Sequence, residues 1–236
     1  MKKNRTALSV VCAVFALMLL VIKELFFSDS VNFYVTSIAI LLLSLLPFFI
    51  SFEHKKISAR EITLTATLIA LAVVGRAAFY LIPQVKPIAA AVIVSSVCLG
   101  AQRGFIIGAF SAFVSNFIFG QGFWTPFQMV ALGAVGLVSG IIFKYIEANR
   151  ITLSLVGFIL AFALYGIIVD FSTVISTYGN NIDFNAIISV YASGAPFSAA
   201  FGLSTAVFLF IFGEGFIKKI NRVNIKYNLL GDENEN

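Results

Sequence analysis

Amide, hydroxyl and aromatic side chains gather in one stretch of the sequence, residues 116–129, between segments that are almost wholly apolar. The stretch contains the only tryptophan of the chain, Trp124, and a Gly-Gln-Gly turn at residues 120–122. Its polar side chains are those of Asn116, Gln121, Thr125 and Gln128. An amide side chain is costly near lipid unless it is hydrogen-bonded, and aromatic rings with a polar edge settle where hydrocarbon meets water. The pattern indicates either the mouth of a small-molecule pocket or an ordinary interfacial turn with one belt tryptophan.

Two ionisable residues, Arg76 and Asp170, lie inside apolar segments. Each stands six residues before the expected outer end of its helix, at Ile82 and Ser176, which is a depth of about 9 Å at 1.5 Å per residue. A charge within the membrane is expensive and marks a functional site by default. A cation below an outward-facing mouth suits a carboxylate, phosphate or carbonyl-rich ligand. The alternative is that the two charges pair with each other and only hold two helices together.

The composition indicates a polytopic membrane protein. Hydrophobic residues make up 60% of the chain and charged residues only 11%, whereas a soluble domain carries roughly 25% charged residues. The 236 residues are nearly filled by apolar runs, which leaves no room for a separate soluble domain. The formal net charge of +5 is therefore a signal of topology and not the footprint of a nucleic-acid-binding protein.

The sequence gives little support for an enzyme. Cys12 and Cys98 lie inside apolar runs and fit neither a disulfide framework nor a metal-ligand spacing, and the only histidine, His54, lies in a charged loop. The chain has no Ser-x-x-Lys motif and no Gly-x-Ser-x-Gly elbow. We therefore expect no catalytic residue, no metal site and no cofactor.

Eight apolar runs predict eight transmembrane helices, so the expected fold class is an all-α integral membrane protein. The runs cover residues 7–22, 33–52, 62–82, 88–101, 104–119, 126–146, 151–176 and 195–217. The first run is expected to be retained, because no small-x-small cleavage site follows it. The fourth and fifth runs are shorter than the ~20 residues that usually span a bilayer. They should be buried among their neighbours or lie where the bilayer is locally thin.

A charged loop, Glu53–Glu61, is the one plausible internal boundary. It separates an added N-terminal two-helix hairpin, residues 1–60, from a six-helix core over residues 61–220. A polar tail, residues 221–236, completes the expected domain organisation.

The positive charges predict the orientation of these helices. With the N-terminus inside, thirteen cations fall in inner loops and tails, and only Lys23 and Lys86 fall outside. The inner cations are Lys2, Lys3, Arg5, Lys55, Lys56, Arg60, Arg103, Lys144, Arg150, Lys218, Lys219, Arg222 and Lys226. This positive-inside bias predicts that both termini are cytoplasmic. The connections Pro83–Pro87, Gly120–Thr125 and Thr177–Ser189 then face outward.

Small residues recur at helical spacing in three of the core runs. Ala66 and Ala70 lie one turn apart in the third run, and glycines repeat in the fifth and sixth at residues 104, 108, 136 and 140. Such stripes let helices approach closely. For the fifth and sixth runs we expect internal packing between the two helices.

An Ala-x-x-x-Ala pair on the first of six core helices, together with three outward loops, resembles the substrate-binding S-component of energy-coupling factor (ECF) vitamin transporters. Longer strings extend the resemblance to one subfamily, often with uncharacterised or corrinoid-type ligands. The strings are Arg76-Ala-Ala-Phe-Tyr-Leu-Ile-Pro-Gln-Val-Lys-Pro87, Ser115-Asn-Phe117 and Phe119-Gly-Gln-Gly-Phe-Trp-Thr-Pro-Phe-Gln-Met129. The resemblance covers about Glu61 to Lys219, and residues 1–60 depart from the six-helix pattern.

The resemblance implies a vitamin pocket near the outer surface and a membrane coupling subunit with two cytosolic ATPases as partners. The chain itself has no Gly-x-x-x-x-Gly-Lys-Ser/Thr motif, so ATP hydrolysis must come from those partners. Ala66 and Ala70 match the surface that docks the coupling subunit. The expected substrate-binding residues are Arg76, Phe79, Tyr80, Lys86, Asn116, Gln121, Trp124, Thr125, Gln128 and Asp170.

Two other classes of membrane protein fit the sequence less well. A self-sufficient secondary transporter of a small organic solute usually needs several buried carboxylates or broken helices, and Asp170 is the only buried carboxylate expected in the outer half. A membrane-embedded enzyme lacks a recognisable nucleophile, acid–base pair or metal set. The residues do not select one ligand. The aromatic side chains favour a flat or bulky ring system, which fits corrinoids, flavins and pterins alike, and a corrinoid is the ligand expected from the resemblance.

Overall fold

The computed structural model describes residues 59–178 and 182–227, and before residue 59 only five isolated positions. Within this described part every regular element is helical, as the sequence predicts. The expected helices over residues 7–22 and 33–52 lie outside the described residues. Six continuous helical segments follow one another from Ala59 to Tyr227, and the total of eight helices stays a prediction.

The first four segments are single α-helices. They are α3 (Ala59–Ala78), α4 (Ile88–Leu99), α5 (Ala101–Phe119) and α6 (Trp124–Ile142). Two glycines separate α5 from its neighbours. Gly100 has φ +89° and Gly120 has φ +100°, a backbone region that side chains rarely allow. Gly100 therefore ends α4 at Leu99, two residues before the end of the hydrophobic run, and Gly120 ends α5 at Phe119, where the run also ends.

The last two segments are longer, and each contains a π-helical turn. One consists of α7 (Arg150–Ile159), η1 (Leu160–Tyr165) and α8 (Gly166–Tyr178), and the other of α9 (Phe184–Phe208), η3 (Leu209–Gly213) and α10 (Glu214–Tyr227). Asn149 caps α7 by accepting hydrogen bonds from the amides of Ile151 and Thr152. The side chain of Asp183 caps α9 by accepting from the amide of Ala186.

The structure corrects two expectations about the last third of the chain. The outward loop expected over Thr177–Ser189 is mostly helical, because α8 ends at Tyr178 and α9 already begins at Phe184. The last helix was expected over residues 195–217, but it continues through α10 to Tyr227. The first seven residues of the expected polar tail, 221–227, are therefore helical.

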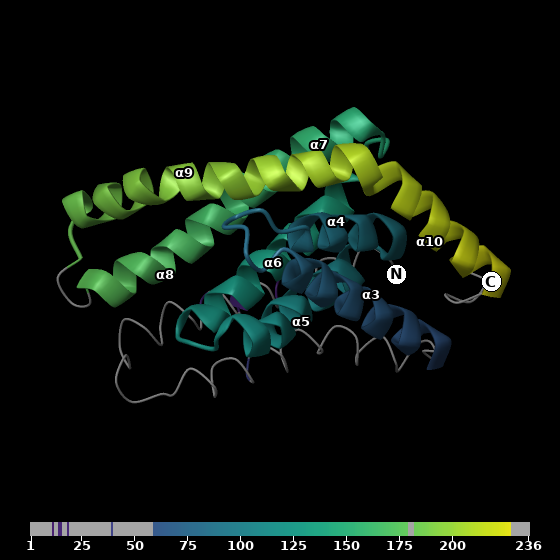
Figure 1. The fold of residues 1–236 in the computed structure, drawn as a ribbon, viewed down its shortest axis with the longest axis horizontal. Coiled ribbons are helices and arrows are strands. Elements are labelled where there is room, and N and C mark those ends of the chain that lie inside the picture. Colours follow the sequence, from purple (N-terminus) through teal and green to yellow (C-terminus); the bar gives the residue numbers. More distant parts are fainter. Residues whose placement is uncertain are drawn as a thin grey trace.

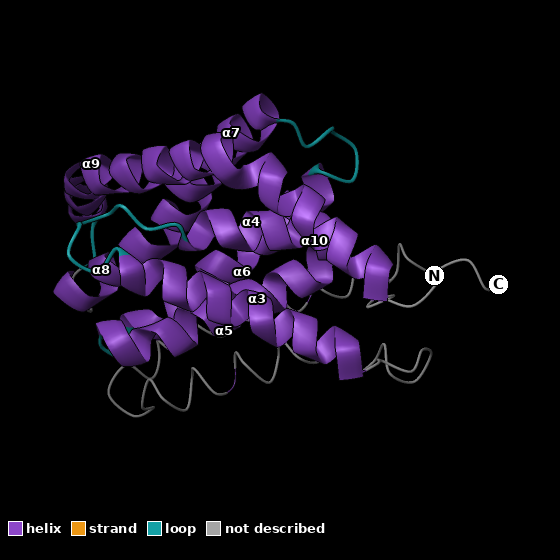
Figure 2. Ribbon diagram, turned by 45° about the vertical axis from the view of Figure 1, so that its right-hand side comes forward, coloured by secondary structure: helices purple, strands orange, loops and turns teal. Residues whose placement is uncertain are grey.

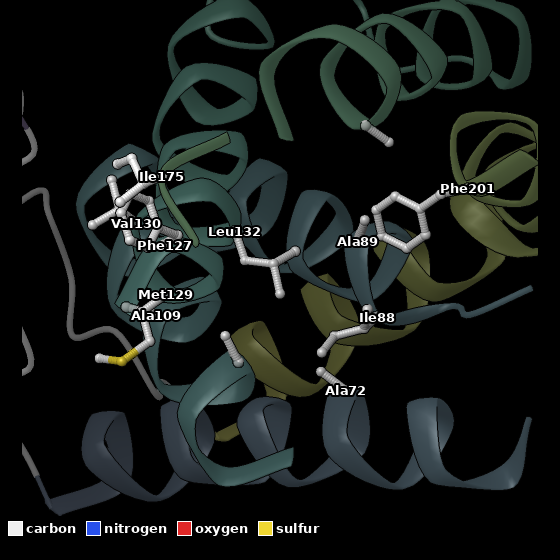
Figure 3. Packing of buried hydrophobic residues seen from close by; sticks show 12 residues of the cluster. Ala72, Ile88, Ala89, Ala109, Phe127, Met129, Val130, Leu132, Ile175 and Phe201 are labelled. Carbon is white, nitrogen blue, oxygen red and sulfur yellow. The ribbon is translucent and has the colours of Figure 1, made fainter. Parts of the chain in front are cut away.

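The helices form layers, with α4 and α6 in the middle. Figures 1 and 2 both show α7 and α9 on one side of these two helices and α3 and α5 on the other. Nine of the twelve residues of α4 are buried, so the expected burial of this short helix among its neighbours is confirmed. The core joins side chains of α3, α4, α5, α6, α8 and α9 (Figure 3), among them Ala72, Ile88, Phe127, Leu132, Ile175 and Phe201.

Helices α5 and α6 approach each other most closely, through their glycines. A Cβ added at Gly104 would lie 2.7 Å from the carbonyl oxygen of Gly136, which no real side chain tolerates. Gly108 meets the backbone of Leu132 in the same way. The expected internal packing of these small residues is confirmed, and the two helices make one backbone-to-backbone unit.

Four of the described helical segments are long and apolar enough to cross a membrane: residues 59–78, 124–142, 150–178 and 184–227. Ile88–Leu99 is a shorter apolar helix. The chain is therefore a multi-pass membrane protein.

Candidate substrate site

Arg76, near the end of α3, joins that helix to α5. Its Nη1 donates a hydrogen bond to Oδ1 of Asn116 at 2.8 Å and another to Oγ of Ser115. Both acceptors are buried on α5, and Asn116 is only 1% exposed. A charged donor strengthens a hydrogen bond, so this contact fixes the C-terminal end of α3 against α5.

The amide of Asn116 extends the network from α5 to α6. Its Nδ2 donates to Oε1 of Gln128 at 2.8 Å and to Oγ1 of Thr125 at 3.1 Å. The same side chain therefore accepts from Arg76 through its oxygen and donates to α6 through its nitrogen. Three helices meet at one buried amide.

The Gly-Gln-Gly turn closes over this network. The Thr125 hydroxyl donates to Oε1 of Gln121 at 3.0 Å and accepts from the amide of Gly122 at 3.1 Å. Nε2 of Gln121 donates to the carbonyl oxygen of Phe113 at 3.0 Å. The polar groups of the stretch are thus satisfied by one another, which is how amides are tolerated at membrane depth.

Trp124 lies over the turn and not inside the network. A Cβ added at Gly122 would lie 2.6 Å from the indole ring, so the ring covers that glycine. The side chain is 38% exposed, and its ring meets that of Phe123 edge-on, with 5.2 Å between centroids. Trp124 therefore offers a partly open aromatic face above the buried polar groups.

Two cations flank the ring of Phe119 at the end of α5. Cζ of Arg76 lies 4.3 Å from the ring centroid and Nζ of Lys86 lies 5.1 Å from it, both within cation–π range. Lys86 also donates to the carbonyl oxygens of Phe79 and of Tyr80, the latter at 3.0 Å. Loss of solvent and the charge of Arg76 lower the pKa of the Lys86 ammonium below its ordinary value. The salt bridges found among the described residues involve neither cation.

Asp170 lies apart from this cluster. Its Oδ2 accepts from Oγ of Ser198 at 3.5 Å, and a Cβ at Gly194 would lie 2.8 Å from the carboxylate. Both contacts place it between α8 and α9. Within the part of the chain that the structure describes, no ion pair joins it to Arg76, whose acceptors are Ser115 and Asn116.

The structure thus brings together seven of the ten residues expected to bind substrate: Arg76, Tyr80, Lys86, Asn116, Gln121, Thr125 and Gln128. Trp124 lies beside them, over the turn, and Asp170 lies outside. Phe79 reaches the cluster only through its backbone carbonyl, since its ring meets that of Phe208, with 5.1 Å between centroids. Sequence reasoning missed two members of the cluster, Ser115 and Phe119. Their positions in the sequence could have identified them, because Ser115 adjoins Asn116 and Phe119 lies one helical turn after it.

Ala66 and Ala70 are both exposed on α3. The side of α3 that packs inside the protein carries other residues, including Leu68 and Ala72. Packing against the other described residues therefore does not account for the alanine pair, and docking of a partner at this face stays a prediction.

An apolar cavity of about 340 Å³ lies between α3, α4 and the segment from α9 to α10. Its walls include Leu71 and Gly75 of α3, Val94 of α4, and Phe208 and Phe212. Of the residues expected to bind substrate, Phe79 alone lines it. This cavity is therefore distinct from the polar cluster around Asn116.

The described part of the chain is thus a bundle of apolar helices with a hydrogen-bonded polar cluster where α3, α5 and α6 meet. The family model described as ECF-type riboflavin transporter, S component, matches residues 56–218. The chain belongs to this family, and it is a substrate-binding transport subunit and not a catalytic one. No curated protein and no solved structure gave a match.

Proposed function

We propose that this chain captures a vitamin-like ring compound on the outer face of the membrane, at the cluster centred on Asn116. The observation that carries the proposal is the Arg76–Asn116–Gln128 network, which ties α3, α5 and α6 together directly beneath an aromatic roof. Buried donors and acceptors at the junction of three helices are the polar groups that orient a ligand in an otherwise apolar pocket.

The substrate class that we propose is a flavin. The matched family carries riboflavin in its name, and nothing in the match supports the corrinoid subfamily that the sequence strings first suggested. A flavin has a flat ring edged with carbonyl oxygens and ring nitrogens. The aromatic faces of Tyr80, Phe119 and Trp124 suit such a ring, and Arg76 with the amides of α5 and α6 suits its polar edge.

We further propose that delivery to the inside requires a membrane coupling subunit and two cytosolic ATPases. The exposed face of α3 around Ala66 and Ala70 is the docking surface in this proposal. Two small side chains one turn apart allow a partner helix to approach closely. In this arrangement α3 carries the docking face along its length and the substrate contact, Arg76, near its outer end.

The proposal is tested by binding on the purified full chain. Excitation of the single tryptophan reports on Trp124 alone, so riboflavin, cobalamin and a pterin can be compared by quenching of its emission. Saturable quenching by riboflavin at stoichiometric ratio supports a flavin site. Saturation by cobalamin and not by riboflavin would restore the corrinoid assignment.

Uptake in cells separates the proposal from a self-sufficient secondary transporter. We expect accumulation of riboflavin only when the coupling subunit and both ATPases are produced together with this chain. Uptake by the chain alone, abolished by a protonophore, would favour an ion-coupled carrier in which Asp170 is the coupling carboxylate.

A further inference from the structure

The last helix is too long to lie wholly within a bilayer. The continuous segment Phe184–Tyr227 has 44 residues, or about 66 Å at 1.5 Å per residue, against a hydrocarbon core of about 30 Å. Its final part, α10, is the polar part: it contains Lys218, Lys219, Arg222 and Lys226 and has no fully buried residue. Part of this helix must therefore lie at or beyond a membrane surface.

A salt bridge marks the level at which α10 begins. Nε of Arg150, the first residue of α7, lies 3.5 Å from Oε2 of Glu214, the first residue of α10, and the Arg150 amide donates to the other carboxylate oxygen at 2.9 Å. The start of α7 and the start of α10 are thus at the same polar boundary. Beyond it, α10 leaves the line of α9, as Figure 1 shows.

After this bend, α10 returns across the ends of other helices instead of projecting away from the protein. Ile217 and Ile220 pack against the buried side chains of α4 and its neighbours, and Ile220 also packs with Leu68 of α3. At the far end, Nη1 of Arg60 at the start of α3 donates to the carbonyl oxygen of Tyr227 at 3.1 Å. The first half of α10 is therefore held against the bundle, and its last residue is joined to the start of α3 by one exposed hydrogen bond.

The remaining surface of α10 is amphipathic. Lys219, Arg222 and Lys226 are exposed and lie three and four residues apart, which places them in one row. Phe216 and Val223, seven residues apart, form an exposed apolar row next to it. A cationic row beside an apolar row is the arrangement of a helix that lies in the boundary between headgroups and acyl chains.

We infer that α10 is a docking surface for anionic phospholipid in the leaflet that faces the C-terminus. Phe216 and Val223 enter the edge of the hydrocarbon, and the cationic row binds the headgroup phosphates. Charge complementarity selects this occupant, since clustered cations on an amphipathic helix next to a transmembrane segment attract anionic lipid. On the predicted orientation this is the cytoplasmic leaflet. The inference does not depend on which substrate the protein carries.

The test uses the full chain in nanodiscs made of phosphatidylcholine alone or of an equal mixture with phosphatidylglycerol. Val223→Cys carries an environment-sensitive fluorophore, and Cys12→Ser with Cys98→Ser removes the native thiols. We expect that acrylamide, a neutral quencher in water, reaches the probe several-fold less well in the mixed membrane. High salt should restore its access, because exposed charges are screened.

Charge variants with a matched control separate lipid binding from a general effect of net charge. Arg222→Gln/Lys226→Gln should remove the protection given by phosphatidylglycerol, since two cations of this kind change affinity by on the order of thirtyfold. Lys144→Gln/Lys218→Gln removes the same charge from the inner face outside the row and should leave the protection in place. The inference would be overturned if acrylamide quenched the probe equally in both membranes. It would also be overturned if both double variants lost the protection by phosphatidylglycerol to the same extent. Protection that appears only when ATPase or coupling subunits are added would do the same and would reassign α10 to protein docking.

Discussion

Oδ1 of Asn116 lies 2.8 Å from Nη1 of Arg76, and this contact links the only charged side chain in the C-terminal half of α3 to the buried amide at the centre of the polar cluster. Asn116 is held from the other side by Gln128 and Thr125. Removal of either partner therefore leaves buried polar groups unsatisfied, and substitutions here should affect stability and binding together.

The first prediction concerns Asn116 itself. Asn116→Leu removes the acceptor for Arg76 and the donor to Gln128, and an unsatisfied buried polar group costs about 1–3 kcal/mol. We expect a lower melting temperature in detergent and loss of riboflavin binding. Asn185→Leu, at an exposed position at the start of α9, is the control. Unchanged stability and affinity in Asn116→Leu would show that the hydrogen-bond network contributes neither to folding nor to ligand binding.

The second prediction concerns Trp124. If its exposed face stacks on the ligand, Trp124→Ala should weaken binding by more than about 2 kcal/mol, or over tenfold. Phe117→Ala, at a ring that is more exposed, should leave affinity unchanged. Because the variant lacks the fluorescent reporter, binding is followed by quenching of riboflavin emission. Affinity equal to that of the parent protein would make residues 120–124 an interfacial turn and would misplace the pocket.

The third prediction separates Arg76 from Asp170. Arg76→Ala should weaken ligand binding, and adding Asp170→Asn should not restore it, because the hydrogen-bond partners of Arg76 are Ser115 and Asn116. Equilibrium binding to the single and double variants gives the coupling between the two sites. Full recovery in Arg76→Ala/Asp170→Asn would mean that the two charges compensate each other and that Arg76 is not a ligand contact.

The fourth prediction concerns the alanine face of α3. Ala70→Trp should leave riboflavin binding to the isolated chain intact, abolish uptake and prevent co-purification with the coupling subunit. Leu203→Trp, at an exposed position of α9, should support normal uptake. Loss of ligand binding or of folding in Ala70→Trp would return the pair to internal packing.

The fifth prediction concerns orientation. A cysteine at Asn181 should react with a membrane-impermeant reagent from outside the cell, and cysteines at Lys56 and Lys144 should not, because the distribution of Lys and Arg places both termini inside. Labelling at Lys56 from the outside would reverse the orientation of the whole chain.

The sequence predicted well those features that depend on local composition. The apolar runs located the described helices, and the glycine spacing of α5 and α6 predicted their contact. The single stretch of amides predicted most of the polar cluster. The predicted start of the last helix was wrong because the polar run 177–183 was extended to Ser189, although residues 184–189 are mostly apolar and already belong to α9. The cap at Asp183, which starts this helix, stands in the middle of the loop expected over residues 177–189.

The position of Asp170 shows a different limit. Counting residues from the helix end gives its depth, but the side it faces depends on the rotation of the helix about its axis. The π-helical turn η1 precedes α8 and shifts that rotation relative to α7. A regular helical repeat extended from α7 therefore does not give the face on which Asp170 lies. The choice of Asn116 as the partner of Arg76 likewise depends on packing between segments 40 residues apart.

The backbone contact between α5 and α6 has a thermodynamic consequence for transport. Since the glycines fix these two helices as one rigid wall, a ligand can change the site chiefly by shifting α3 and the loop that follows it. The proposed docking face lies on that same helix. If the ligand and the coupling subunit each prefer one position of α3, binding of either one must alter the affinity for the other by the same factor. A ligand-bound subunit and a ligand-free subunit would then bind the same coupling subunit with different affinities. The position of α3 alone would produce this difference.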